Sequence, residues 1–119
     1  MSTPAIDNSA LDEIRSLQKP GRENLLQKIV GLYVEQAKVL RERIGHAVAT
    51  ADATELRESA HSLKSSSGNV GAIRVSALSR ELELAGHEGR LDGAAPLFDE
   101  LVVELERAVR ELSLVSQSG

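Results

Sequence analysis

The sequence contains no cysteine, few aromatic residues and no long apolar run. Without cysteine the chain has no disulfide and no thiolate metal site, which agrees with a reducing compartment. Its apolar runs fall short of the roughly 18 residues that a membrane span needs. The polar start MSTPAIDNS lacks the charged-then-apolar layout of a secretory signal. We therefore expect a cytoplasmic protein that has no membrane partner.

A net positive charge is also absent. Lysine and arginine number 14 against 18 aspartate and glutamate residues, which gives a net charge of -4. No overall basic field is available to neutralise a phosphate backbone, so we expect no nucleic-acid partner. The composition, 41% hydrophobic and 27% charged, is typical of folded globular proteins. A length of 119 residues predicts one domain, with a core over about 7–115 and flexible polar termini.

The apolar residues are mostly Leu, Val, Ala and Ile, and they recur at intervals of three and four. This spacing is typical of amphipathic helices. The connections between the apolar stretches are short, and each long helix has one apolar face to bury. The sequence thus predicts an all-α fold, an antiparallel four-helix bundle with a short additional N-terminal helix. The expected helices cover residues 7–18, Arg22 to about Thr50, Asp52 to Gly68 or Val70, 73–85, and about Pro96 to the polar tail SQSG.

Several residues are typical of helix ends. Asp52 with Glu55 three residues later predicts a capping box, in which each side chain accepts from the other's backbone amide. Gly71 is able to take the left-handed conformation that turns a chain after a helix. Gly86, Gly89 and Gly93 are expected to break the apolar pattern after the fourth helix. Pro96 suits the first turn of the fifth helix, where its missing amide costs little.

A helical wheel of the third predicted helix separates two faces, at about 100° per residue. The apolar stripe of this helix defines the buried direction. On the wheel, this stripe and His61 lie on different faces of the helix. His61 is therefore expected to point away from the core. The buried stripe consists of Leu56, Ala60, Leu63 and Ser67, and the outward face carries Arg57, His61, Lys64, Ser65 and Gly68.

This outward face combines groups that suit a phosphoryl group. A free imidazole has a pKa of about 6.5, so much of it is neutral at cellular pH and one ring nitrogen can attack phosphorus. Lys64, one turn after His61, is able to contact phosphoryl oxygens through a charge-assisted hydrogen bond, which contributes about 1.5 to 3 kcal/mol. Gly68, two turns along, removes a side chain and allows a partner to approach closely.

The segment Ala60-His61-Ser62-Leu63-Lys64-Ser65-Ser66-Ser67-Gly68-Asn69-Val70-Gly71-Ala72 resembles histidine phosphotransfer (HPt) domains of bacterial two-component phosphorelays. The resemblance extends through Leu78, Leu82-Glu83 and Gly86, and it covers most of the chain. It implies that His61 is the phosphorylated residue and that Lys64 supports the phosphoryl group. Gly68 would lie at the receiver-docking surface, with Arg57 and Ser65 beside it. Ser65 stands where the family commonly has glycine.

The resemblance also implies what the chain works with. It would be a phosphoryl carrier, not an enzyme acting alone, and would exchange phosphoryl groups with response-regulator receiver domains and a hybrid histidine kinase. The chain itself would bind no cofactor, because the receiver domain supplies the magnesium ion. The docking surface would be the exposed side of the third helix with part of the long helix before it. A monomer is expected, because no helical face remains unpaired after the bundle packs.

Other readings of the same residues stay open. The rival function is a non-catalytic helical interaction module, a degenerate HPt domain in which His61 is chemically idle.

His46 and His87 lie on different segments without the spacing of metal ligands, so we expect no metal site and two surface histidines. Carboxylates spread along the helices beside basic neighbours are expected to be solvated and to form no acid/base pair: Glu81, Glu83, Glu88, Asp99 and Glu100.

Overall fold

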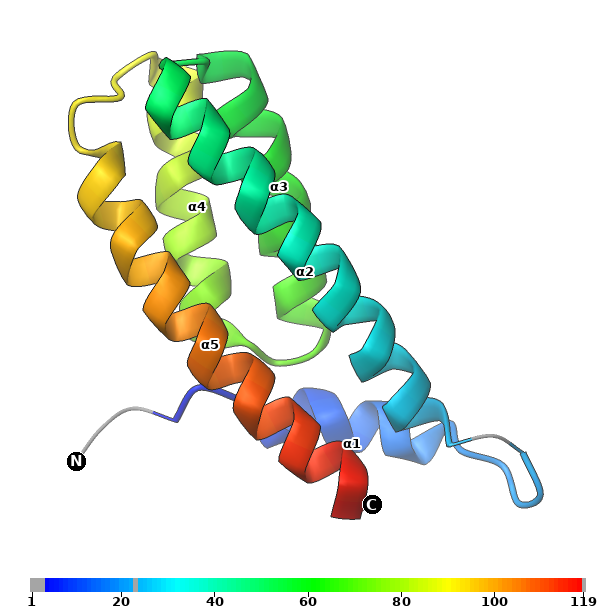
Figure 1. The fold of residues 1–119 in the computed structure, drawn as a ribbon. Helices are drawn as coiled ribbons and strands as arrows, with labels where there is room; N and C mark the ends of the chain where they lie inside the picture. Colours follow the sequence, from blue (N-terminus) through cyan, green and yellow to red (C-terminus); the bar gives the residue numbers. More distant parts are fainter. Residues whose placement is uncertain (1–3, 23, 119) are drawn as a thin grey trace.

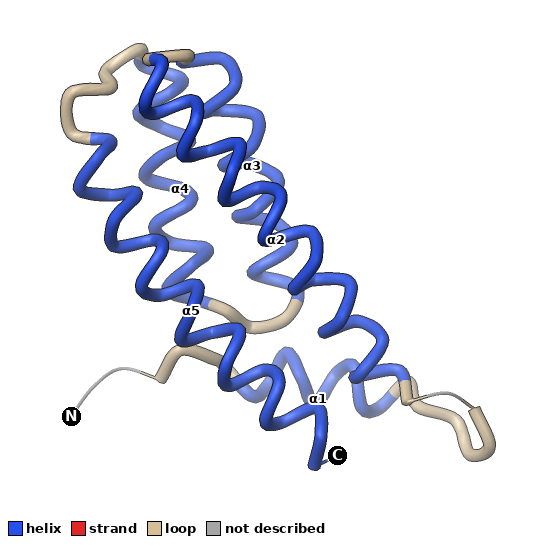
Figure 2. The backbone as a smooth tube through the Cα atoms, in the orientation of Figure 1, coloured by secondary structure: helices blue, strands red, loops and turns tan. Residues whose placement is uncertain are grey.

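The computed structural model describes residues 4–22 and 24–118, and in this part of the chain all regular structure is helical. The helices α2 to α5 form an antiparallel bundle, and the short α1 packs across one end of it (Figures 1 and 2). This arrangement confirms the predicted fold class. The helices are α1 (Asn8–Ser16), α2 (Leu25–Thr50), α3 (Ala53–Asn69), α4 (Ile73–Glu88) and α5 (Ala94–Ser118).

Each long helix packs against two neighbours in the bundle. The pairs in contact are α2 with α3, α3 with α4, α4 with α5, and α5 with α2. The α3–α4 seam and the α2–α5 seam therefore lie on opposite sides of the molecule. In Figure 1, α2 and α5 lie in front of α3 and α4. None of the described helices is long and apolar enough to cross a membrane.

The core is made of the apolar stripes that the helical periodicity predicts. Leu56, Ala60, Leu63 and Ser67 of α3 are all fully buried, as the wheel predicts. Tyr33 of α2 is buried beside them, and its hydroxyl lies 2.7 Å from Ser67 Oγ. Burial raises the pKa of Tyr33 to about 12, although its hydrogen bond with Ser67 partly offsets this rise. Tyr33 is therefore a neutral structural residue.

The helix starts depend on side-chain caps. Asp7 accepts a hydrogen bond from the Ser9 amide and caps α1. Asn24 accepts from the Gln27 amide, so α2 begins at Leu25 and not at Arg22 as predicted. Asp52 caps α3, as predicted, by accepting from the Glu55 amide at 3.1 Å.

The reciprocal half of the predicted capping box is absent. The Glu55 carboxylate accepts a hydrogen bond from Arg43 Nε of α2 at 2.5 Å, which links α2 to α3. The first helix is shorter than predicted, because α1 ends at Ser16 and not at residue 18. Leu17 is 68% exposed, because a strict three-residue spacing drifts around a helix of 3.6 residues per turn.

Gly86 does not break the fourth helix, contrary to prediction. Helix α4 continues to Glu88, and Gly89, the next of the predicted glycines, ends it with a left-handed φ of +69°. A Cβ atom on Gly86 would lie 2.8 Å from both the Ala53 carbonyl oxygen and the Arg57 amide nitrogen of α3. Gly86 therefore permits a close approach between α3 and α4.

The segment before α1 is part of the packed structure. Gly71 adopts a left-handed φ of +76° between α3 and α4, as predicted, and its carbonyl accepts from the Asp7 amide at 2.7 Å. Ala5 and Ile6 are buried in the core. At the other end of the chain, Ser116 is only 7% exposed. Residues near both ends of the chain therefore contribute to its packing.

The close approach at Gly86 leads to a stability prediction. We expect Gly86→Ala to lower the free energy of unfolding by about 1 to 3 kcal/mol, because the new methyl group overlaps the α3 backbone. The matched control is Gly68→Ala, whose Cβ would meet only Ser76 Oγ at 3.9 Å. That change should stabilise the protein by up to about 1 kcal/mol through helix propensity. Urea unfolding measures both variants, and equal stabilities would contradict the close seam.

Candidate functional site

His61 lies on the outward face of α3, opposite the buried side chains of Leu56, Ala60 and Leu63. Its side chain is 60% exposed, which confirms the direction that the wheel predicts. The imidazole nevertheless has a partner on a neighbouring helix. Its Nδ1 atom lies 2.6 Å from Oε2 of Glu83, a residue of the neighbouring helix α4.

Glu83 joins the two residues that the sequence motif singles out. While Oε2 contacts His61, the other carboxylate oxygen, Oε1, accepts a hydrogen bond from Lys64 Nζ at 2.6 Å. The Glu83 side chain is only 19% exposed. The prediction that Glu83 is an ordinary solvated carboxylate is therefore wrong. One carboxylate links His61 and Lys64 across the α3–α4 seam.

The electrostatics of this cluster keep Glu83 ionised. Partial burial alone would raise the pKa of Glu83, but the hydrogen bonds and positive charges of Lys64 and His61 outweigh it, so the pKa is lowered from its ordinary value. An ionised carboxylate only accepts hydrogen bonds. His61 must therefore donate from Nδ1, and in the neutral ring the lone pair is then on Nε2.

The α3–α4 seam sets the register that brings these groups together. Gly86, one turn after Glu83, lies against the α3 backbone at Ala53 and Arg57. Further along the seam, Ser76 Oγ donates to the Lys64 carbonyl oxygen at 3.0 Å. These two contacts lie on either side of Glu83 along α4. They fix its position relative to α3.

The other predicted site residues lie around this cluster. Arg57, Ser65 and Gly68 are all exposed, on the same side of α3 as His61. Arg57 lines a depression of about 400 Å³ together with His61 and Glu83, and it forms no ion pair with a described residue. Lys64 is half-buried with its ammonium at Glu83, so it is not a solvated cation.

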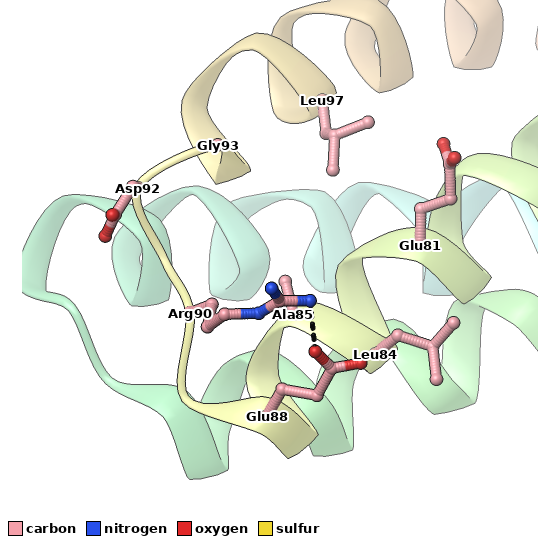
Figure 3. A pocket seen from close by; sticks show the side chains of 8 residues that line it. All are labelled: Glu81, Leu84, Ala85, Glu88, Arg90, Asp92, Gly93 and Leu97. Atoms are coloured by element: carbon pink, nitrogen blue, oxygen red, sulfur yellow. Dashed lines mark hydrogen bonds and ion pairs between the residues drawn. The ribbon is translucent and has the colours of Figure 1, made fainter.

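Other side chains that could carry chemistry lie elsewhere. His46 and His87 are exposed on α2 and α4. Over residues 4–22 and 24–118, no three His, Cys, Asp or Glu side chains are grouped to hold a metal ion. A hollow of about 480 Å³ at the connection between α4 and α5 is lined by Leu84, Leu97, several carboxylates and Arg90, which pairs with Glu88 (Figure 3). His61 does not line this hollow.

The cluster can therefore present a nucleophile to a partner. The His61 ring is exposed to solvent, a partly buried carboxylate contacts its Nδ1 atom, and an ammonium lies at the same carboxylate. Sequence reasoning missed Glu83 as part of the site. The one available signal was its place beside Leu82 and before Gly86 in the resemblance, because periodicity within a single helix does not reveal which residues of two helices face each other.

The ionised state of Glu83 predicts a pH effect on stability. An acid whose pKa is lowered by folding stabilises the folded state above its unfolded pKa, and this contribution is lost as the pH falls through the folded pKa. We expect wild type to exceed Glu83→Gln in unfolding free energy at about pH 6, and this difference to shrink between about pH 5 and pH 3. Urea unfolding at stepped pH measures it.

A matched control for this experiment is Glu81→Gln. Glu81 is exposed on the same helix, and its side chain forms no ion pair or hydrogen bond with a described residue. Its substitution should leave the pH dependence of stability unchanged. A wild-type advantage over Glu83→Gln that is constant from pH 6 to pH 3 would contradict the charged cluster.

Comparisons with known proteins agree with this geometry. The family model "Hpt domain" matches residues 28–113. The solved structure of histidine-containing phosphotransfer protein B from Pseudomonas aeruginosa PAO1 superposes with a TM-score of 0.88 at 23% identity, over 99% of each chain. At this identity the likeness concerns the fold. A search of curated proteins gave no match. Because the family model spans well over half of the chain, the protein belongs to the Hpt domain family, the phosphoryl carriers of phosphorelays.

Proposed function

We propose that this protein relays a phosphoryl group between receiver-domain aspartates through a phosphohistidine at His61. The observation that carries the proposal is the contact of His61 Nδ1 with Glu83, which leaves Nε2 of a 60% exposed imidazole available. Among the three histidines, His61 alone has a described carboxylate partner. The protein would act as a carrier in complex with its partners and not as an enzyme by itself.

The transfer step follows from this geometry. The Nε2 lone pair attacks the phosphorus of a receiver's phospho-aspartate, an N–P bond forms, and the acyl-phosphate P–O bond breaks to release the aspartate carboxylate. The ring keeps its proton on Nδ1 and gains positive charge as the bond forms. The Glu83 carboxylate, which accepts that proton's hydrogen bond, offsets the charge. The reverse transfer to a second receiver passes through the same state.

Lys64 is placed to support the phosphoryl group. A lysine ammonium has three donors, and Glu83 accepts from only one of them. The remaining donors can contact phosphoryl oxygens on His61, because both side chains bind the same carboxylate. Phosphorylation adds negative charge beside Glu83, and the ammonium neutralises part of it.

The docking surface would combine the exposed faces of α3 and α2. Arg57, Ser65 and Gly68 surround His61 on α3. On α2, Leu32 and Val39 are 59% and 56% exposed, and Leu32 lines a small depression with residues of α3. A small docking surface suits partners that bind and separate. The partners would be response-regulator receiver domains, which supply the magnesium ion, and a hybrid histidine kinase, with this chain acting as a monomer in the cytoplasm.

His61→Gln tests the proposal directly. Incubation with a phosphorylated receiver should place acid-labile, base-stable label on the wild-type chain and none on the variant. Matched controls are His46→Gln and His87→Gln, which remove exposed histidines from other positions and should leave labelling unchanged. Label that persists in His61→Gln would refute the assignment of His61. Wild-type protein that accepts no label from any phosphorylated receiver of its source would favour the rival function, a non-catalytic interaction module.

Lys64→Ala tests the supporting role of the ammonium. We expect transfer to His61, or the lifetime of the phosphohistidine, to fall about 10- to 100-fold, the size of one charge-assisted contact. The control is Lys28→Ala, which removes an exposed lysine of α2. Circular dichroism checks that both variants remain folded. Equal rates for Lys64→Ala and Lys28→Ala would show that Lys64 does not contact the phosphoryl group.

A further inference from the structure

A groove of about 300 Å³ runs between α2 and α5, on the side of the bundle opposite the α3–α4 seam. Its floor is apolar. Ala37 and Leu105 are buried at 1% and 4% exposure, and Val34 and Val109 are half-buried at its sides. Helices α2 and α5 form its two walls and face the viewer in Figure 1.

Three cations surround this apolar floor. Lys38 and Arg41 extend from α2 and Arg110 from α5, while Glu106 is the one carboxylate among the lining residues. None of the three cations forms an ion pair with a described residue.

The net charge of the residues that line the groove is opposite in sign to the net charge of the whole chain. The protein has a net charge of -4, yet this groove carries three cations and one carboxylate. Like charges around one groove repel each other, and an anionic partner relieves that repulsion. Covering the apolar floor with a partner's apolar side chains would remove that surface from water, which is favourable. The groove therefore fits a partner that is both apolar and acidic.

We propose that the α2–α5 groove binds an acidic amphipathic helix of a partner protein. Val34 and Arg41 are seven residues apart on α2, which corresponds to about 10 Å, or two helical turns. A docked helix places apolar residues at i, i+4 and i+7 along such a groove. Carboxylates beside these residues would then face Lys38, Arg41 and Arg110.

The position of the groove gives this surface a distinct use. His61 and Glu83 lie at the α3–α4 seam, across the bundle from α2–α5. A helix bound in the groove leaves the outward face of α3 uncovered. The protein could thus stay attached to one partner through the groove while a second protein docks at His61. This inference does not depend on the chemistry of His61.

Titration of the ¹⁵N-labelled full chain with synthetic helical peptides tests the proposal. The first peptide has leucines at i, i+4 and i+7 flanked by glutamates, the second replaces those glutamates with lysines, and the third replaces the leucines with serines. We expect the first to bind at least about tenfold more tightly than either control. Its chemical-shift changes should map to Val34, Arg41, Leu105 and Val109 and spare His61, and added salt should weaken it.

Charge reversal provides the matched comparison. The triple variant Lys38→Glu, Arg41→Glu and Arg110→Glu should lose at least about tenfold in affinity for the first peptide. The control variant makes the same change in net charge at exposed cations outside the groove, with the substitutions Arg22→Glu, Lys28→Glu and Arg80→Glu. It should keep most of the affinity. The single variant Arg110→Glu gives the same comparison with less disturbance to folding.

Three results would overturn the proposal. One is equal affinity for the glutamate and lysine peptides, which would mean that the cations of the groove do not discriminate between acidic and basic peptides. Another is a set of chemical-shift changes centred on α3 and His61. The third is an equal loss of affinity in the groove variant and the control variant, which would show that the overall charge of the protein, and not the groove, determines peptide affinity.

Discussion

The Glu83 carboxylate is the group on which the site depends. It accepts hydrogen bonds from His61 Nδ1 and Lys64 Nζ, both at 2.6 Å, and it lies on a different helix from its two partners. Both donors lower its pKa, so it stays ionised, and its ionised state in turn determines which nitrogen of His61 carries the proton. The Glu83 side chain exposes only 19% of its surface, whereas the His61 ring that it holds is 60% exposed.

This arrangement requires that α3 and α4 lie close together in one register. Gly86 permits the approach, since a Cβ atom there would overlap the α3 backbone. Ser76 fixes the other side of the contact through the Lys64 carbonyl oxygen. The buried stripe of α3, from Leu56 to Ser67, then directs His61 to the surface. Packing thus exposes the ring while the carboxylate of α4 orients it.

The sequence predicts the directions of side chains within each helix better than the relations between helices. Periodicity of 3.6 residues correctly places Leu56 and Leu63 inside and His61 outside, and it predicts the all-α bundle. It does not predict that Glu83 faces His61, because a register between two helices depends on packing. Gly86 is mistaken for a helix end for the same reason. A glycine that permits close packing and one that stops a helix look alike in sequence.

The central claim is that Glu83 holds Nδ1 of His61 and leaves Nε2 to accept the phosphoryl group. Nitrogen-15 NMR of the phosphorylated protein, labelled at histidine, tests it most directly because coupling to phosphorus identifies the bonded nitrogen. The account predicts ³¹P coupling to Nε2 of His61 and a protonated Nδ1 that is hydrogen-bonded to Glu83. Phosphorus on Nδ1 of His61, or on a different histidine, would contradict it.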